Sequence, residues 1–507
     1  MSENVTNKKK RRRLKIRPGA LTWFILLMLS IVFSFVIFRF PLLPKKWKFV
    51  CIGIIALLDL IVGFFSFRKT RKGNKTGISV VNTLLAICML FGSLFIPQLS
   101  GRIEDVFADM PETTEVVVNV YALKTEYKTA HSEQFRAKGV SMITDTDLMN
   151  YKNKQFITQS AVDQENQNWT LTQIKELFGT DTLWENNTSS VWEAVNALYN
   201  ADGDALVMNA AYADLLIEEP SYASFKEDTI ILKTFTRSTD NGASKKKVDS
   251  DKPFAVLIAG SDSRDAALTP VTRTDVDIIA VVNPGEKKIL LVSLPRDTYM
   301  ANPIMDNGMD KLTHMGVYGV ENTTNALSQF FGMELDKYIL VNFNTYAKIV
   351  NTLNGVDIVN PYQFTGLGYT FPAGNIHLSG EEALAYVRER HSLANGDFDR
   401  NEHQVIVLRA LIKKMLSAEV LSNFSSVLDA LNGTFLTNLS TDSVFEIVSD
   451  QLDSVGSWTI TSRHVDGSTA SEECVSMPGQ LLSVVYPDEG VVDSIRNEMF
   501  EILETEE

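Results

Sequence analysis

Arginine and aspartate residues gather in two short stretches that lie far apart in this 507-residue chain. The first stretch runs from Phe254 to Thr298 and contains three apolar runs. Its charged residues cluster at the ends of those runs, and they are Asp262, Arg264, Arg273, Asp275, Asp277, Arg296 and Asp297. Charged groups are costly to bury without a partner. Several arginines and carboxylates at the ends of core strands therefore indicate a built functional site.

A second polar cluster lies between residues 388 and 404. Its members are Arg388, Arg390, Asp397, Arg400 and Gln404. Residues two apart point to nearly opposite faces of a helix but share a face on extended chain. The first two arginines therefore converge only if the helix before them has ended. The other three residues are spaced by three and then four positions, which places them on one helical face.

Together the two stretches supply six arginines close to carboxylates. Arginine forks bind phosphate oxygens in pairs and stay charged, and magnesium prefers one or two carboxylates together with phosphate oxygens and water. This combination indicates a pyrophosphate held with magnesium. Single arginine–aspartate pairs on a protein surface commonly have no functional role. That alternative is less favoured here, because two separate clusters indicate the same kind of site. The sequence contains no Walker loop, no HExxH, no GxSxG and no GxGxxG after a strand.

The elements expected to position these charges alternate in type. Three short β-branched runs, Phe254–Ala259, Ile278–Val282 and Ile289–Leu294, are typical of buried strands. A turn signal at residues 283–285 predicts a hairpin between the last two. Further strands are expected at Tyr338–Phe343 and Val356–Val359, and helices at Thr323–Phe331, Tyr346–Leu353, Ala383–Tyr386 and roughly Gln404–Leu416. Residues 420–507 are expected to add helices and the apolar segment Leu481–Tyr486. This order predicts an α/β layered domain with a mixed central sheet flanked by helices.

The charge of the chain is sharply divided at about Ser100. Up to that residue there are 17 Lys or Arg and 2 acidic residues; beyond it there are 31 Lys or Arg and 60 acidic residues. Three apolar runs in the first part are long enough to span a bilayer: Leu21–Phe38, Phe49–Phe67 and Ile78–Leu99. Basic residues before the first run and after the second place the N-terminus in the cytoplasm. An odd number of spans then exports the rest of this multi-pass chain.

The exported part is acidic, which argues against general nucleic-acid binding because such binding needs a basic surface. Its single cysteine, Cys474, has no exported partner for a disulfide, since Cys51 and Cys88 lie in the spans. A bacterial cell membrane fits this pattern better than a disulfide-rich secreted protein. Asp59 lies inside the second span. A carboxylate in a membrane span either belongs to a functional site or makes a packing contact between helices.

Residues 101–236 are expected to form a small α/β accessory domain. Strands are predicted at Val116–Tyr121 and Thr229–Phe235, and helices at Leu171–Phe178 and Val191–Tyr199, the second with Ser190 and Glu193 placed for a capping box. No catalytic constellation occurs there, which favours a spacer or interaction role. The expected organisation is a basic cytoplasmic tail (1–17), three transmembrane helices (18–100), the accessory domain (101–236), a linker (237–253) and the α/β domain (254–507), with its motifs in 254–415.

Several short motifs follow one another in the α/β domain. They are Gly260-Ser-Asp-Ser-Arg264, Arg273-Thr-Asp275, Ser293-Leu-Pro-Arg-Asp-Thr298, Lys311 with His314, Leu378-Ser-Gly380, Val387-Arg-Glu-Arg390 and Gly396-Asp-Phe-Asp-Arg400. In order and spacing they resemble the LytR-CpsA-Psr family. The three spans and the accessory domain resemble its capsule-associated branch. One departure is His403, where many members have arginine.

The resemblance implies a magnesium-dependent phosphotransferase acting outside the membrane. It would move a glycopolymer, a capsular polysaccharide or a teichoic-acid-like polymer, from a polyprenyl-pyrophosphate carrier to peptidoglycan and form a phosphodiester. Asp262 and Asp275 would bind Mg2+, with Mn2+ as the alternative ion. Asp397 would orient arginines or activate the acceptor hydroxyl, acting with Arg388, Arg390 and Arg400. The residues expected to hold the pyrophosphate are Arg264, Arg273, Arg296, Lys311, Arg388, Arg390, Arg400 and Gln404.

Two other functions stay open at this point. A membrane regulator or scaffold would bind lipid-linked intermediates or cell-wall assembly proteins without transferring anything. A lipid pyrophosphatase would use the same site with water as the acceptor. The partners expected in each case are a polyprenyl-pyrophosphate-linked glycan, peptidoglycan and membrane lipid, and no nucleic acid.

Overall fold

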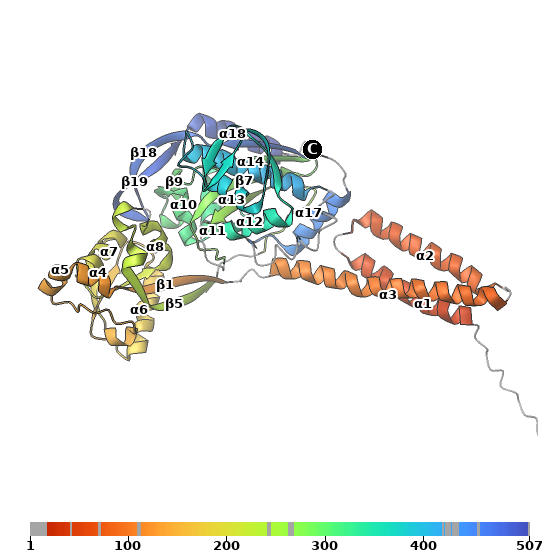
Figure 1. The fold of residues 1–507 in the computed structure, drawn as a ribbon, viewed down its shortest axis with the longest axis horizontal. Helices are drawn as coiled ribbons and strands as arrows, with labels where there is room; N and C mark the ends of the chain where they lie inside the picture. Colours follow the sequence, from red (N-terminus) through yellow and green to blue (C-terminus); the bar gives the residue numbers. More distant parts are fainter. Residues whose placement is uncertain are drawn as a thin grey trace, which may run out of the picture. The chain divides into compact units, whose positions relative to one another are not determined.

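The computed structural model describes residues 18–40, 43–68, 72–108, 113–217, 219–240, 245–261, 268–417, 420, 427, 435–453 and 457–504. The chain divides into two compact units (Figure 1). Of the described residues, those within 18–105 and 444–453 belong to the first unit, and those within 106–443 and 457–504 belong to the second.

The first unit is built on three long apolar helices: α1 (Pro18–Arg39), α2 (Lys45–Phe67) and α3 (Lys72–Ala108). Each contains a stretch that is long and apolar enough to cross a membrane. These stretches are Gly19–Arg39, Lys45–Phe67 and Thr76–Gln98. The three predicted spans are therefore confirmed as candidate membrane helices, which indicates that the chain is anchored in a membrane.

Asp59 makes contacts between the first two of these helices. Its carboxylate accepts a hydrogen bond from Ser30 Oγ (3.2 Å), and its backbone carbonyl accepts one from Trp23 Nε1 (2.9 Å). Asn82 of α3 donates to the hydroxyl of Ser66 on α2 (3.1 Å). Polar pairs of this kind hold transmembrane helices together. The contacts of Asp59 therefore fit the helix-packing interpretation.

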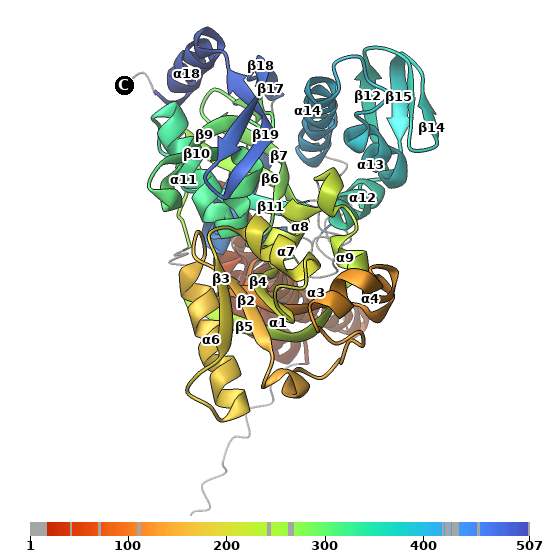
Figure 2. The same cartoon turned by 90° about the vertical axis from the view of Figure 1, so that its left-hand side faces the viewer.

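The second unit begins with a five-stranded sheet in the order β3-β2-β4-β1-β5. Figure 2 labels β2, β3, β4 and β5 of this sheet. Its strands are β1 (Thr113–Leu123), β2 (Gln155–Gln159), β3 (Trp184–Thr188), β4 (Ala205–Asn209) and β5 (Thr229–Asp240). Its helices are α4 (Thr125–Ala130), α5 (Ser132–Ala137), η1 (Leu148–Tyr151), α6 (Gln164–Phe178), α7 (Val191–Tyr199), α8 (Ala210–Leu216), η2 (Pro220–Tyr222) and α9 (Phe225–Asp228). Ser190 caps α7 as predicted, but Glu193 bonds back to Ser189 instead of Ser190, so the capping box is not closed.

A six-stranded sheet in the order β16-β11-β6-β7-β8-β17 forms the centre of the α/β domain. Its strands are β6 (Phe254–Ser261), β7 (Thr274–Asn283), β8 (Lys288–Leu294), β11 (Tyr338–Asn342), β16 (Phe435–Thr437) and β17 (Thr459–His464). The predicted hairpin is present as the antiparallel pair β7–β8. Because β11 pairs parallel with β6 and β17 parallel with β8, the sheet is mixed, as predicted.

Both faces of this sheet are covered, which explains why its central strands are apolar on both sides. On one face, Leu257 and Ile279 pack with Leu327 of α11 (Val320–Phe331) and Met499 of α18 (Glu489–Leu503). On the other face, Val256, Ile278 and Leu291 pack with Val405 of α14 (Asp397–Met415). Alternate residues of one strand therefore enter different layers.

Smaller elements complete the domain. They are β9 (Tyr299–Asn302), η3 (Pro303–Met305), β10 (Gly308–Lys311), α10 (Leu312–Met315), η4 (Gly316–Tyr318), α12 (Phe343–Thr352), β12 (Val356–Asn360), β13 (Phe364–Gly366), β14 (Tyr369–Phe371), β15 (Gly374–Leu378), α13 (Gly380–Arg388), β18 (Gly467–Cys474) and β19 (Met477–Pro487). Helix α17 (Thr441–Asp453) begins in the second unit and belongs to the first from residue 444 onward. The predicted strand at 356–359 is present, but β12 pairs with β15 outside the central sheet. The C-terminal part supplies the strands β17, β18 and β19 in addition to helices.

Candidate functional site

An ion pair at one end of the β7–β8 hairpin forms the centre of the candidate site. Asp275 lies near the start of β7 and Arg296 just beyond the end of β8, and the antiparallel register brings these two ends together. Arg296 Nη1 donates to Asp275 Oδ1 at 2.8 Å, and the side chains are only 10% and 14% exposed. Removing one partner of such a pair destabilises the fold strongly, because the other charge is left without a partner.

The second cluster of the sequence reaches this ion pair. Burial alone would raise the pKa of Asp275, but the charges of Arg296, Arg273 and Arg400 outweigh it and hold the pKa below its usual value. Arg400 belongs to α14, whereas Arg273 and Arg296 flank the hairpin. The two stretches predicted from the sequence therefore converge.

Asp397 and Arg400 occupy the first turn of α14. Arg400 Nη2 lies 2.6 Å from Asp397 Oδ1. Burial raises the pKa of Asp397 above its usual value, against the opposing charges of Arg400 and Arg296. A carboxylate with a raised pKa is a better proton acceptor than an ordinary one. The helix begins at Asp397, earlier than the predicted start near residue 404, because Gly396 (φ 57°) lets the chain turn directly into it.

Lys311 joins the same group of charges through Asp297. Its Nζ lies 3.3 Å from Asp297 Oδ1, and Arg296 Nε lies 3.9 Å from the other oxygen of that carboxylate. Lys311 ends β10, and its side chain is only 9% exposed. The site therefore gathers cations from separate elements around partly buried carboxylates.

Arg388, Arg390 and Gln404 lie around the end of α13. The helix stops at Arg388, and Glu389 is extended (φ −67°, ψ 132°), which meets the condition under which the two arginines converge. The charge of Arg390 acts on both Asp397 and Arg400. Gln404 Nε2 donates to the carbonyl of Val387 at 3.4 Å, so it ties α14 to the end of α13.

Of the predicted metal ligands, Asp275 lies in this centre, whereas Asp262 and the phosphate ligand Arg264 lie outside the described residues. Asp277, two positions along β7, is fully buried; Thr274 Oγ1 donates to its Oδ2 at 3.0 Å, and among the described residues its Oδ1 has no hydrogen-bond partner. Burial and the neighbouring charge of Asp275 raise the pKa of Asp277 to about 7. An orphaned carboxylate oxygen beside a second carboxylate suits the oxygen ligands that Mg2+ prefers.

Another group of metal-ligand side chains is already satisfied without an ion. Ligand atoms of Asp310, His314 and Cys474 lie within 4.8 Å of one another in the interior. Asp310 Oδ1 accepts hydrogen bonds from His314 Nδ1 and from Ser476 Oγ, both at 2.8 Å. Burial raises the pKa of the Cys474 thiol to about 12, so it stays protonated. We interpret this group as a hydrogen-bond network between β10, α10 and the β18–β19 hairpin.

His403 lies in an aromatic cluster. Its ring stacks on Phe364 (centroids 4.7 Å apart) and lies 4.3 Å from the ring of Tyr386. Burial lowers its pKa to about 4, so it is neutral at physiological pH. Its Nε2 has no hydrogen-bond partner among the described residues. The residue therefore packs as an aromatic side chain.

A hollow of about 430 Å3 lies beside the first turns of α14. It is lined by Asn395, Phe398, Asp399, Glu402, His464, Asp466 and Gly467. His464 pairs with Ser293 in the β17–β8 register, so this wall stands next to the strand end that leads to Arg296. The hollow therefore shares both of its walls with elements of the charged centre. Its lining carries negative charge from Asp399, Glu402 and Asp466, whereas the arginines of the charged centre are positive.

Comparison with known proteins confirms the family resemblance inferred from the sequence. A sequence profile of the LytR_cpsA_psr family matches residues 221–481. The chain is 32% identical over 225 residues to the polyisoprenyl-teichoic acid–peptidoglycan teichoic acid transferase TagU of Enterococcus faecalis, covering 44% of this chain and 74% of that protein. It is 34% identical over 209 residues to the protein of the same name from Bacillus mycoides, covering 41% and 67%.

One solved structure serves for comparison. The crystal structure of B. subtilis TagU is 29% identical, covers 50% of this chain and 99% of its own, and superposes with a TM-score of 0.40. Since the family match spans just over half of the sequence and the relatives align at 30% identity or above, this chain belongs to the LytR_cpsA_psr family.

Proposed function

We propose that this protein is a phosphotransferase that moves a glycopolymer from a polyprenyl-pyrophosphate carrier to peptidoglycan. The observation that carries the proposal is the convergence of Asp275 and Arg296 with Asp397 and Arg400 in one buried, charged centre. The names of two relatives, which describe transfer of teichoic acid to peptidoglycan, support the same reaction type. The three candidate membrane helices would keep the enzyme beside a lipid-linked donor.

The arginines of the centre would bind the donor pyrophosphate. The charges of Arg296, Arg273 and Arg400 all act on Asp275, so the three guanidinium groups share the neighbourhood of this carboxylate. Guanidinium groups fixed by carboxylates are already oriented, and they stabilise charge on transferring and leaving phosphates without further rearrangement. Asp275 and Asp277 would hold a magnesium ion, which when bound supplies positive charge to the pyrophosphate.

Asp397 would accept the proton of the acceptor hydroxyl. The acceptor oxygen forms a bond to the sugar-linked phosphorus, and the bond from that phosphorus to the bridging oxygen breaks. Polyprenyl phosphate leaves with the electron pair, and the acceptor proton passes to Asp397. The product is a phosphodiester between glycopolymer and acceptor, so charge and atoms balance.

The acidic hollow beside α14 would hold the acceptor sugar. Phe398 offers an apolar surface, and Asp399 and Glu402 offer carboxylate oxygens that accept hydrogen bonds from sugar hydroxyls. The same carboxylates repel an anionic donor, which keeps the two substrates in separate places. Phe398 and Asp397 belong to the same first turn of α14, so the hollow and the proposed base are carried by one helical element.

The test uses the full-length protein in lipid nanodiscs. It is supplied with a polyprenyl-pyrophosphate-linked glycan, a peptidoglycan fragment and magnesium, and the phosphodiester product is measured by mass spectrometry. We expect product with the wild type, and none with Arg400→Ala or with a chelator. Arg409→Ala, an exposed position on the same helix, is the matched control and should keep activity.

Each alternative outcome has a distinct meaning. Release of glycan phosphate without coupling would favour a pyrophosphatase over a transferase. Tight binding of the lipid without any reaction would favour a scaffold. Full activity of Arg400→Ala would refute the assignment of this centre.

A further inference from the structure

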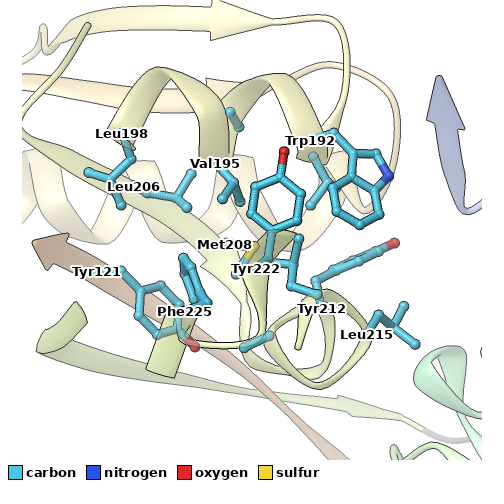
Figure 3. Packing of buried hydrophobic residues seen from close by; sticks show 14 of the residues in the cluster. Tyr121, Trp192, Val195, Leu198, Leu206, Met208, Tyr212, Leu215, Tyr222 and Phe225 are labelled. Carbon is cyan, nitrogen blue, oxygen red and sulfur yellow. The ribbon is translucent and has the colours of Figure 1, made fainter. Parts of the chain in front are cut away.

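The accessory domain and the α/β domain share one hydrophobic core. Trp192 and Tyr212 of the accessory domain belong to the same buried cluster as Val317, Met477 and Val484 of the α/β domain. Figure 3 shows Trp192, Tyr212 and Leu215 packed in this cluster. Burial of apolar surface on this scale favours a fixed arrangement of the two domains over a flexible tether.

Helix α8 of the accessory domain makes two polar contacts across this core. The hydroxyl of Tyr212 lies 2.6 Å from that of Tyr318, and Arg273 Nη1 donates to the backbone carbonyl of Asp214 at 3.2 Å. Asp214 lies in the last turn of α8, where carbonyls lack helical partners and carry partial negative charge. A guanidinium is well suited to such a helix end.

The two segments that α8 touches also support each other. The backbone N–H of Thr272 donates to the carbonyl of Gly316 at 3.0 Å, and that of Val320 donates to the carbonyl of Pro270 at 2.9 Å. A Cβ at Gly316 would lie 2.2 Å from the carbonyl oxygen of Thr272, so only glycine allows this approach. The segment that carries Arg273 therefore rests on the segment that carries Tyr318.

We propose that α8 is a positioning element of the phosphate site, which holds Arg273 so that binding of a pyrophosphate depends on docking of the accessory domain. The inference rests on the proposed function, because Arg273 is assigned there to the donor. Arg273 is almost fully buried, at 7% exposure, and its charge acts on Asp275. The same guanidinium thus contacts the accessory domain and takes part in the charged centre.

The experiment measures binding of farnesyl pyrophosphate to the full-length protein in detergent with magnesium. Tyr212→Phe keeps the ring in the core and removes the hydrogen bond to Tyr318. We expect its dissociation constant to rise about threefold to tenfold, the range of one lost hydrogen bond. In an Arg273→Gln background the same substitution should have almost no further effect, because the residue being positioned is gone.

Tyr222→Phe is the matched control. It removes a buried tyrosine hydroxyl of the same core, whose hydrogen bond to Asn196 Oδ1 (2.8 Å) stays within the accessory domain. A general loss of stability would affect both tyrosine variants and both backgrounds alike. An unchanged dissociation constant in Tyr212→Phe, or an equal rise in Tyr222→Phe, would overturn the proposal.

Hydrogen exchange supplies a readout that needs no ligand. The amides of Thr272 and Val320 should exchange faster in Tyr212→Phe than in the wild type or in Tyr222→Phe. If the wild type binds no farnesyl pyrophosphate, the phosphate assignment of the proposed function fails. The exchange rates then decide separately whether α8 supports the Arg273 segment, and unchanged rates refute that support.

Discussion

Asp397 combines two properties that a proton acceptor needs. Its carboxylate is held in place by Arg400 at 2.6 Å, and burial raises its pKa. Asn in its place keeps the shape but cannot take the acceptor proton. We therefore expect Asp397→Asn to lower kcat for transfer by about 10²- to 10⁴-fold, the usual contribution of a general base. Steady-state assays with a lipid-linked donor check this value.

The affinity for the donor separates this role from a purely structural one. The amide oxygen of asparagine can still accept a hydrogen bond from Arg400, so the arginines that bind the pyrophosphate should stay in place. The dissociation constant of the donor should therefore change far less than kcat in Asp397→Asn. Asp357→Asn, at a side chain that is 81% exposed, is the control and should behave as wild type. Transfer at the wild-type rate by Asp397→Asn would rule out its role as base.

The lowered pKa of His403 predicts how the stability of the fold depends on pH. Its pKa is about 4 in the folded chain, below the ordinary value near 6.5 that the unfolded chain would show. Between these values the unfolded state takes up the proton more readily. Stability is therefore intact above about pH 6.5 and falls as the pH drops toward 4. The loss attributable to this residue is about 2 kcal/mol between pH 7 and pH 5.

The comparison of His403→Phe with the wild type isolates this contribution. Phenylalanine keeps the stacking on Phe364 and Tyr386 and removes the titrating group. Thermal unfolding of the full-length protein in detergent at pH 7 and pH 5 should show a smaller acid loss in the variant. An equal loss in both proteins would show that His403 takes up no proton when the chain unfolds, so that its pKa is not lowered in the folded protein.

At the scale of elements, prediction worked where the local pattern and the fold agree. The β7–β8 hairpin has a strong turn signal between two apolar runs, and its register places Asp275 beside Arg296. Strand β17 gives little local signal, because Thr459–His464 has a single aliphatic residue and lies at the sheet edge. Its pairing with β8 is therefore determined by tertiary contacts and not by the local sequence. The early start of α14 did have a signal, since acidic residues in a first turn favour a helix start.

The hollow beside α14 gives a prediction about binding of the acceptor. If it holds the acceptor sugar, Phe398→Ala should raise the KM for a peptidoglycan fragment about tenfold, because an aromatic surface is lost from the pocket. The affinity for farnesyl pyrophosphate should stay the same, since the arginines are untouched. Steady-state kinetics with each substrate varied in turn measure both quantities. A rise in KM for the donor alone would place the donor in the hollow.

At the scale of the whole molecule, some contacts could not be read from sequence. The motifs predicted that Arg273, Arg296 and Arg400 would gather, because their types and order indicate phosphate binding, and their charges do converge on Asp275. The hydrogen bond from Arg273 to the carbonyl of Asp214 involves a backbone atom of another domain. No residue type marks such a partner. The docking of the accessory domain therefore became visible only in the folded chain.

The direction in which the chain crosses the membrane gives the last prediction. The three candidate spans and the basic residues around the first two predict that the N-terminus lies inside and the α/β domain outside. A cysteine introduced at Ile143, which is 72% exposed in the accessory domain, should react with a membrane-impermeant maleimide in intact cells. Cys474 supplies little background, because it is fully buried and its pKa is raised to about 12.

A cysteine at Ser2 in the basic tail is the opposite case. It should react only after the cells are permeabilised, because an odd number of spans separates the two ends. Labelling is read by mass spectrometry of the purified full-length protein, which distinguishes the introduced cysteines from Cys51 and Cys88 in the apolar helices. The reverse pattern would place the charged centre in the cytoplasm. Peptidoglycan could then not be the acceptor, and the proposed reaction would have to be abandoned with the orientation.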